Sequence, residues 1–178
     1  DYMKNSILKI TLFTFIILFT ADIYSQRRAK KKADEDTKNW RYEIQCLNVA
    51  SEGSYIVKIF SYSKKKNVAV EQSKKNAVHA VIFRGIPQNE VGCVRQPPLA
   101  RHPNLQEKNR DFFDNFFSDN GDYQKFVTLT TDGAIAPGDR LKVGKREYKI
   151  GLIVSVDIAG LRKELEAAGI IKSLSSGF

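Results

Sequence analysis

Residues 54–84 read SYIVKIFSYSKKKNVAVEQSKKNAVHAVIFR, and two different periodicities follow one another in this stretch. Residues 55–62 are rich in aromatic and β-branched side chains, which is typical of a β-strand. Residues 67–84 repeat small and apolar side chains at helical spacing and predict a helix, with Gly85 suited to its C-terminal end. The stripe consists of Val70, Ser73, Ala77 and Val81, whereas Gln72, Lys75, Asn76 and His79 lie off it and are expected on a polar face.

The sequence before this unit predicts another strand. Residues 41–49 alternate between apolar and polar side chains, with Tyr42, Ile44 and Cys46 on one face. A Ser-Glu-Gly-Ser turn at 51–54 then has the length that joins two strands of a hairpin.

The sequence after the unit predicts two more strands and two more helices. The strands are expected at 123–131 and 147–156, and a helix is expected from residue 104 to 118. Asp157 can cap a last helix that carries apolar residues at helical spacing. Strands that follow one another without a crossover helix favour the α+β class. We therefore expect a mainly antiparallel sheet of about four strands, with two to three helices packed mostly on one face.

The composition fits one folded domain. The chain has 178 residues, of which 42% are hydrophobic, and this is too many for an intrinsically disordered protein. Lysine and arginine exceed aspartate and glutamate by 29 − 20 = 9. Two cysteines are too few for a disulfide-dense scaffold or for a four-ligand zinc site of the usual kind.

Residues 1–25 have the pattern of a signal peptide. Two lysines and an apolar run follow Met3, the expected native start, and Ser25 is small enough to precede a cleavage site. The alternative is a retained membrane anchor, but the uncharged stretch 10–21 is shorter than the roughly 20 residues that a spanning helix needs. We expect a protein that is exported and is either periplasmic or associated with the outer membrane. No cysteine lies next to the expected cleavage site, so we do not expect a lipoprotein.

The rest of the chain divides into three parts. Residues 26–39 are charged and lack an apolar period, which predicts a flexible arm. This arm is either a soluble linker or a contact for membrane phosphate or another protein. Residues 40–172 are expected to form the single α+β domain, and residues 173–178 a C-terminal tail.

Cys46 and Cys93 form a disulfide candidate. An oxidising envelope favours the bond, which would close a loop with a separation of 93 − 46 = 47 residues. In the chain-entropy model such a loop is worth roughly 4 kcal/mol. The alternative is two separate thiols, with Cys46 packed as a small core residue.

A proline-rich segment and a phenylalanine-rich helix are the candidates for binding a partner. Segment 85–103 is longer than the structureless loops of compact domains usually are. The helix that follows carries two i,i+4 phenylalanine pairs, of which one can enter the core while the other lies partly exposed or meets the loop. The alternatives are core packing for the phenylalanines and ordinary solvation for the arginines. The candidates are Arg95, Gln96, Pro97, Pro98, Arg101, Phe112, Phe113, Phe116 and Phe117.

The sequence offers no motif for catalysis or for a cofactor. His79 and His102 lack metal-ligand spacing and are both expected at the surface. No Gly-x-Ser-x-Gly elbow, P-loop or calcium loop is present. We therefore expect no catalytic residue, no metal and no cofactor.

Two blocks resemble a known envelope module. Strand 54–62 with helix 68–83, and YKIGLIVSV (148–156) with GLRKELEAAG (160–169), resemble the N-terminal domain of flagellar assembly protein T and related small outer-membrane lipoproteins. This resemblance implies an envelope-assembly or scaffold role without catalytic residues.

Three other stretches resemble a second family. Residues 40–49, VHAVIFRG (78–85) and GCVRQPPL (92–99) are similar to an uncharacterised family of exported Bacteroidetes proteins of similar length. That resemblance implies export but no activity.

The first functional hypothesis is therefore an exported, non-enzymatic envelope protein that binds another protein or acts as an assembly scaffold. The first alternative is a periplasmic binder of a small ligand, a glycan or a lipid headgroup. The second is an unrecognised enzyme that acts on the cell wall through paired carboxylates. The expected partner is an envelope protein, with peripheral contact to a membrane or an anionic glycan. Acidic residues surround the phenylalanine cluster and argue against nucleic-acid binding.

Overall fold

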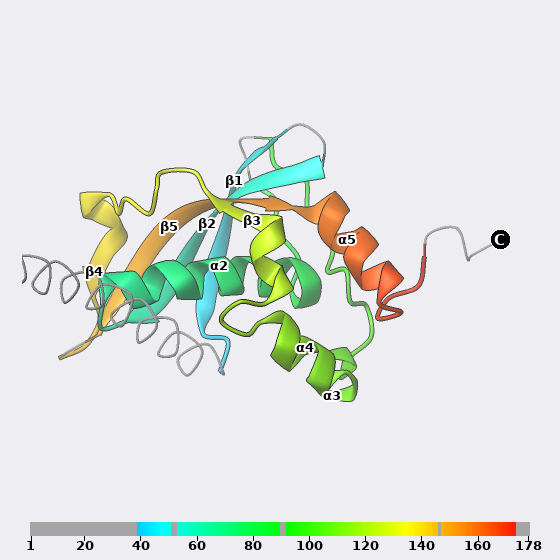
Figure 1. The fold of residues 1–178 in the computed structure, drawn as a ribbon. Helices are drawn as coiled ribbons and strands as arrows, with labels where there is room; N and C mark the ends of the chain where they lie inside the picture. The colour runs from blue at the N-terminus through cyan, green and yellow to red at the C-terminus, as the bar shows by residue number, and fades with distance from the viewer. Residues whose placement is uncertain (1–38, 51–52, 90–91, 146, 174–178) are drawn as a thin grey trace, which may run out of the picture.

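The computed structural model describes residues 39–50, 53–89, 92–145 and 147–173 (Figure 1). The predicted signal peptide at 1–25 lies outside the described residues, as do most of the charged arm and most of the tail. The described elements are β1 (Tyr42–Val49), β2 (Ser54–Ser63), α2 (Lys66–Phe83), α3 (Leu105–Lys108), α4 (Arg110–Phe116), the 3-10 turns η2 (Asp122–Phe126) and η3 (Pro137–Asp139), β3 (Val127–Leu129), β4 (Arg140–Lys142), β5 (Tyr148–Asp157) and α5 (Ile158–Ala167).

The five described strands form one antiparallel sheet around β5. Strand β5 pairs along its whole length with β2, and β2 pairs with β1 in the predicted hairpin. The other edge of β5 is shared, because β3 pairs with residues 154–156 and β4 pairs with residues 148–150. The predicted α+β class with a mainly antiparallel sheet is confirmed.

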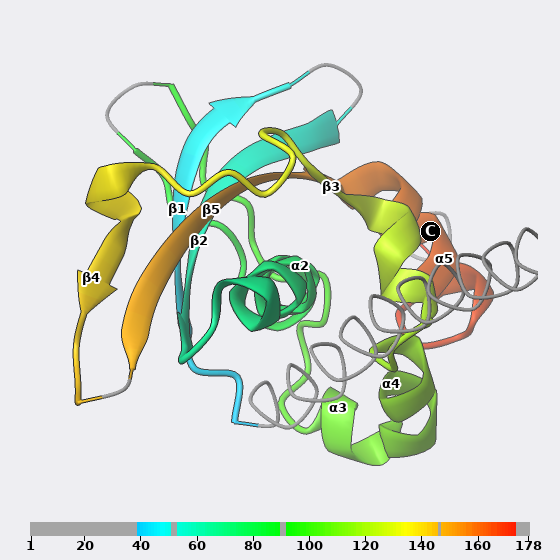
Figure 2. The ribbon, with the colours of Figure 1, turned by 60° about the vertical axis from the view of Figure 1, so that its left-hand side comes forward.

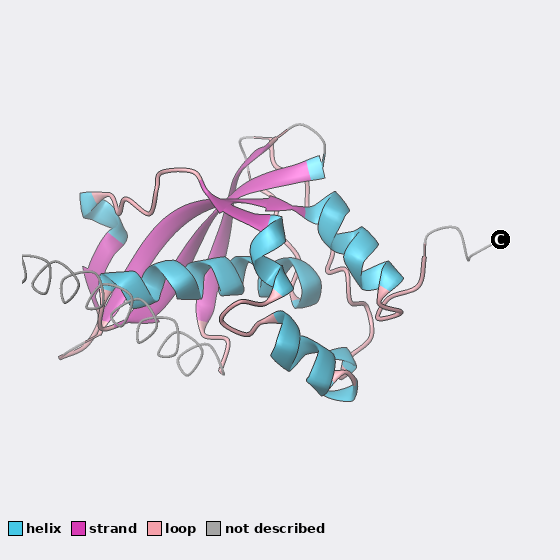
Figure 3. Cartoon of the chain, in the orientation of Figure 1, coloured by secondary structure: helices cyan, strands magenta, loops and turns pink. Residues whose placement is uncertain are grey.

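The sheet curls around α2, as Figure 2 shows looking nearly along the helix. Alternate residues of β2 and β5 face the helix and are buried, as expected for a period of two. Val57, Ile59, Leu152 and Val154 are each at most 1% exposed. The α-helices gather on this concave side, whereas the short turn η3 lies beside β4 (Figure 3). The hydrophobic core thus lies between the curled sheet and α2.

The prediction of a polar face on α2 is wrong. Gln72, Lys75, Asn76 and His79 are at most 4% exposed, as are the apolar residues between them. A periodicity argument assumes that a helix buries only one side, whereas contacts surround α2 on several sides: the sheet covers one and η2 packs against another. The polar side chains are buried with the rest of the helix.

Two predicted elements differ in detail, and one strand was not predicted. The predicted helix 104–118 is divided at Asn109 into α3 and α4, and the Asn109 side chain donates a hydrogen bond to the Leu105 carbonyl oxygen (2.9 Å). The first part of the predicted strand 123–131 is η2, so β3 has only three residues. Strand β4, also of three residues, was not predicted. The cap of the last helix is confirmed, because Asp157 accepts a hydrogen bond from the Gly160 N–H (2.9 Å).

Candidate functional site

An open groove of about 1100 Å³ lies between the proline-rich segment and the helices that follow it. One wall is the end of the proline-rich segment, residues 98–103, and the other is formed by α3 and α4. Aromatic side chains from three separate places also line it, namely Trp40 before β1, Phe83 at the end of α2, and Phe113 with Phe117 around α4. The groove therefore lies where the two predicted partner-binding segments meet.

The end of α2 holds the proline-rich segment in place. The last carbonyl groups of a helix have no partner within the helix. Here the Leu99 and Ala100 N–H groups donate to the carbonyl oxygens of Val81 (3.1 Å) and Ile82 (2.8 Å). Gly85 starts the turn away from the helix with a positive φ of 78°, where a Cβ atom would stand 2.4 Å from the Gln96 carbonyl oxygen. This wall of the groove is thus fixed by backbone hydrogen bonds.

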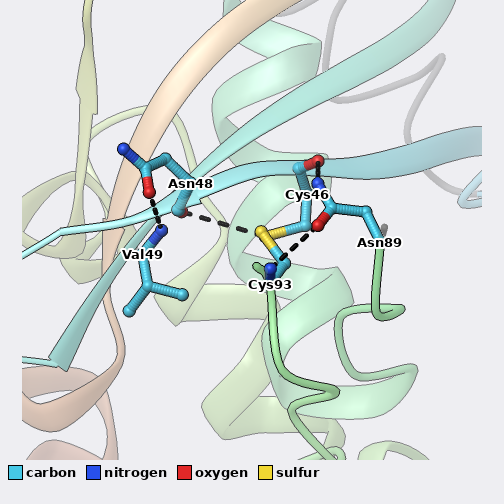
Figure 4. The surroundings of a disulfide bond; sticks show 5 residues. All are labelled: Cys46, Asn48, Val49, Asn89 and Cys93. Carbon is cyan, nitrogen blue, oxygen red and sulfur yellow. Dashed lines mark hydrogen bonds between the residues drawn. A yellow bond between two sulfur atoms is a disulfide. The ribbon is translucent and has the colours of Figure 1, made fainter. Parts of the chain in front are cut away.

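A disulfide between Cys46 and Cys93 ties the same segment to β1 (Figure 4). The bond confirms the predicted pair, and both residues are buried. Asn89 stabilises the joint, because its side chain donates to the Cys46 carbonyl oxygen (2.9 Å) and accepts from the Cys93 N–H (2.8 Å). The segment is therefore attached to the edge of the sheet as well as to the end of α2.

The floor of the groove is a chain of aromatic contacts. The Phe83 and Phe113 rings meet edge to face with centroids 5.0 Å apart, and Trp40 meets Phe117 in the same way at 4.9 Å. Phe113 and Phe117 stack on each other as the predicted i,i+4 pair (6.3 Å). Trp40 and Phe83 are only partly buried, so part of this aromatic surface faces the groove.

His79 lies beneath the floor and connects it to α3. Its ring stacks on Trp40 with centroids 3.7 Å apart. Its Nδ1 lies 2.8 Å from the Tyr42 hydroxyl, and its Nε2 lies 3.3 Å from Gln106 Oε1. Since the carbonyl oxygen of Gln106 accepts, Nε2 carries the proton and Nδ1 accepts from the Tyr42 O–H. The prediction that His79 lies at the surface is wrong.

The surroundings of His79 keep it neutral. Burial lowers its pKa from the usual 6.5 to about 3, and burial likewise raises the pKa of the Tyr42 hydroxyl. A hydrogen bond to Gln106 acts in the opposite direction on His79 but is the smaller effect. His79 and Tyr42 are thus an uncharged, hydrogen-bonded pair. The His79 ring positions Trp40 by stacking and positions α3 through its hydrogen bond to Gln106.

The rim of the groove carries charges of both signs. Arg101 and Arg110 contribute guanidinium groups, and Glu107 and Asp114 contribute carboxylates. All four residues are exposed. An apolar floor with a charged rim is the usual layout of a surface that binds another molecule.

Some of the predicted partner-binding residues line the groove, and others lie elsewhere. Pro98, Arg101, Phe113 and Phe117 line it, although Phe113 and Phe117 are largely buried. Arg95 and Gln96 instead line a separate hollow of about 480 Å³ beside β1. The remaining three lie elsewhere: Pro97 is exposed, Phe112 is half-buried on α4, and Phe116 is buried and stacks on Phe126.

Sequence reasoning missed Trp40, His79, Phe83 and Gln106. Two signals were available, namely the only tryptophan of the chain just before the first strand and a histidine within an otherwise apolar helical stretch. Neither signal could predict that these side chains lie near α3. The position of α3 depends on the backbone hydrogen bonds that hold the proline-rich segment against the end of α2.

Within the described ranges, no group of three or more histidine, cysteine, aspartate or glutamate side chains could hold a metal ion. None of the helices in the described part of the chain is both long enough and apolar enough to cross a membrane. Comparisons of the chain with protein-family models, with curated proteins and with solved structures found no match.

Proposed function

We propose that this is an exported, non-enzymatic protein-binding module of the cell envelope, whose groove receives a segment of another protein. The observation that carries the proposal is the groove itself, with an aromatic floor from Trp40, Phe83 and Phe113 between the proline-rich segment and α4. Aromatic residues are enriched in the centres of protein interfaces, where they provide much of the binding energy.

The disulfide supports export. Disulfides persist in oxidising compartments and are rare in the cytosol, and the Cys46–Cys93 bond is buried within the domain. We place the protein in the periplasm or at the outer membrane, because residues 1–25 have the pattern of a signal peptide. The resemblance of two blocks to an envelope module points to the same location.

The layout of the groove favours a peptide segment as its occupant. Its volume of about 1100 Å³ lies close to the upper end of the range for small-molecule sites, and the groove is open rather than enclosed. The aromatic floor suits an apolar anchor side chain, while Arg101 and Glu107 on the rim can pair with charges of either sign beside that anchor. The fixed wall at Leu99 and Ala100 keeps the groove formed before binding, which reduces the entropy lost on association.

Site-specific photo-crosslinking in the source cells tests this proposal. A photoreactive phenylalanine replaces Arg110 on the rim, and a matched one replaces Lys163, an exposed residue on α5. We expect a discrete protein adduct from position 110 and none from position 163. The adduct should disappear when Glu107→Trp fills the groove in the same chain. Equal adducts from both positions, or an adduct that persists with Glu107→Trp, would contradict the proposal.

A glycan or lipid headgroup is the second candidate. The specific observation in its favour is that Arg101 lines the groove together with the partly exposed Trp40 and Phe83, since guanidinium groups bind anions. Native mass spectrometry of the protein purified from source cells separates the candidates. A bound non-protein mass that is lost with Arg101→Ala would favour this candidate over a peptide.

A cell-wall enzyme is the weaker alternative. Glu107 and Asp114 both line the groove, and two carboxylates are the minimum for glycoside hydrolysis. A general acid at neutral pH requires a carboxyl group in an apolar environment that excludes water. Both residues are exposed on short helices, which is why we propose binding rather than hydrolysis.

A further inference from the structure

The hairpin of β4 and β5 forms the end of the molecule opposite α5 (Figures 1 and 2). Leu141 pairs with Lys149 in the register, and Lys142 pairs with Tyr148. The Val143 N–H closes the turn by donating to the Glu147 carbonyl oxygen (3.1 Å). Strand β4 is thus an edge strand of the sheet, at the end of the molecule away from α3 and α4, which line the groove.

Positive charge dominates this hairpin. Residues 140–145 and 147–150 include Arg140, Lys142, Lys145 and Lys149 against the single carboxylate of Glu147, which is 4 − 1 = 3 positive charges in excess. Arg140, Lys142 and Lys145 are exposed.

The nearby acidic groups do not cancel this excess. The Arg41 guanidinium, outside the hairpin, lies 3.2 Å from the Glu147 carboxylate, and Lys149 lies 2.6 Å from the Glu43 carboxylate. Since each carboxylate already has a cation beside it, the positive field of the three exposed side chains is available to a partner.

Two large apolar side chains are exposed beside these charges. Leu141 is 51% exposed and Val143 is 47% exposed, and both are among the few large hydrophobic residues that the described structure leaves in solvent. Because side chains alternate along a strand, Leu141 points to the face opposite Arg140 and Lys142. Strand β4 and the residues after it thus combine exposed apolar side chains on one face with exposed basic side chains on the other.

We propose that this hairpin binds the surface of an anionic lipid bilayer. Leu141 and Val143 would enter the boundary between headgroups and acyl chains, while Arg140, Lys142 and Lys145 approach the lipid phosphates. Nucleic acids and acidic glycans would attract the same cations but have no apolar layer for Leu141 and Val143. The combination of the two residue types therefore favours lipid. This inference is independent of the groove.

A local probe tests whether the tip enters a membrane. An environment-sensitive fluorophore is attached at position 143 of the full chain, and a matched one at position 94, where Val94 is 71% exposed in the proline-rich segment. Vesicles of phosphatidylcholine with and without phosphatidylglycerol are then added. We expect a blue shift at position 143 only, and only with phosphatidylglycerol. A probe at 143 that stays in water, or an equal shift at both positions, overturns the proposal.

Paired variants then test each part of the surface by vesicle flotation. Lys142→Gln with Lys145→Gln should lower binding to anionic vesicles by about tenfold or more, while the same change at Lys163 and Lys172 on and after α5 should leave binding unchanged. High salt should weaken the binding of the natural chain.

The apolar pair is tested in the same way. Leu141→Ser with Val143→Ser should lower vesicle binding by about tenfold, and Val94→Ser should not. If the serine pair binds vesicles as well as the natural chain and heparin competes fully, the hairpin is a general polyanion site and the lipid proposal is wrong.

Discussion

The two faces of the curled sheet use polar side chains in opposite ways. On the concave face, polar groups are enclosed and bonded to one another: Ser61 and Ser73 hydroxyl oxygens lie 3.0 Å apart, and Asn76 donates to Ser61 (2.9 Å). All three residues are at most 2% exposed. A buried polar group that loses its partner costs about 1–3 kcal/mol, so this face depends on each of its hydrogen bonds.

The convex face carries a network of charges over aromatic rings. Lys58 lies 2.9 Å from the Asp139 carboxylate, and the Arg41 guanidinium covers the Tyr62 ring at 3.9 Å. Gly151 allows this layer to lie close to the sheet, since a Cβ there would stand 2.9 Å from Phe60 and 3.1 Å from Asp139. The Lys58–Asp139 pair is partly shielded, with side chains 21% and 15% exposed, whereas the Arg41–Glu147 pair is exposed at 59% and 37%. Exposed ion pairs contribute only about 0–1 kcal/mol each. Loss of one side chain should therefore lower the free energy of unfolding more on the concave face than on the convex face.

Alanine variants of two neighbouring residues of β5 test this difference in stability between the faces most directly. Leu152 faces the core and is 1% exposed, whereas Ile153 faces outward and is half-buried. Leu152→Ala should lower the free energy of unfolding by about 2–5 kcal/mol, because it leaves a cavity. Ile153→Ala should cost clearly less. Urea denaturation measures both, and equal losses would show that the convex layer packs as tightly as the core.

Acid should act on the concave face through His79. Its pKa is about 3 in the folded protein and 6.5 when unfolded, so it stays neutral while the unfolded chain gains a proton. Stability is therefore complete above about pH 6.5 and falls as the pH drops from there toward 3. His79→Gln, followed by urea denaturation across this range, should be less stable at neutral pH and should have a flatter pH dependence. An unchanged slope would mean that other groups cause the loss.

The sequence was sufficient for features that depend on local pattern. The β1–β2 hairpin, α2, β5 and the Asp157 cap all follow from periodicity and from side chains that act on their own backbone. The Cys46–Cys93 pair could also be predicted, because the chain contains only two cysteines and an exported context favours a bond.

The features that the sequence did not predict depend on neighbours distant in the chain. His79 and Asn76 are buried because the sheet curls around α2. The periodicity of the helix alone cannot predict how the sheet curls. The break at Asn109 depends on a side chain that competes for a backbone carbonyl. Strand β4 has three residues and is defined by pairing with β5, so local propensity gave no signal. The groove depends on tertiary contacts that place the Trp40 and Phe83 rings on either side of His79.

The smallest effect is expected on the convex face at Glu43. This carboxylate accepts hydrogen bonds from Lys149 (2.6 Å) and from the Tyr62 hydroxyl (2.8 Å). Both hydrogen bonds lower the pKa of Glu43, and the one from Lys149 has the larger effect. Glu43→Gln keeps an acceptor for Tyr62 but removes the charge, so it should cost less than about 1 kcal/mol, and less still at high salt.

The direction of the pH effect gives this last prediction a second test. Because folding lowers the pKa of Glu43, its contribution is present above the pKa of the unfolded chain and is lost as the pH falls through the folded value. The denaturation curves of Glu43→Gln and the natural chain should therefore differ at neutral pH and converge in acid. A loss as large as that of Leu152→Ala, or a difference that grows in acid, would mean that the convex network stabilises the sheet as a buried cluster does.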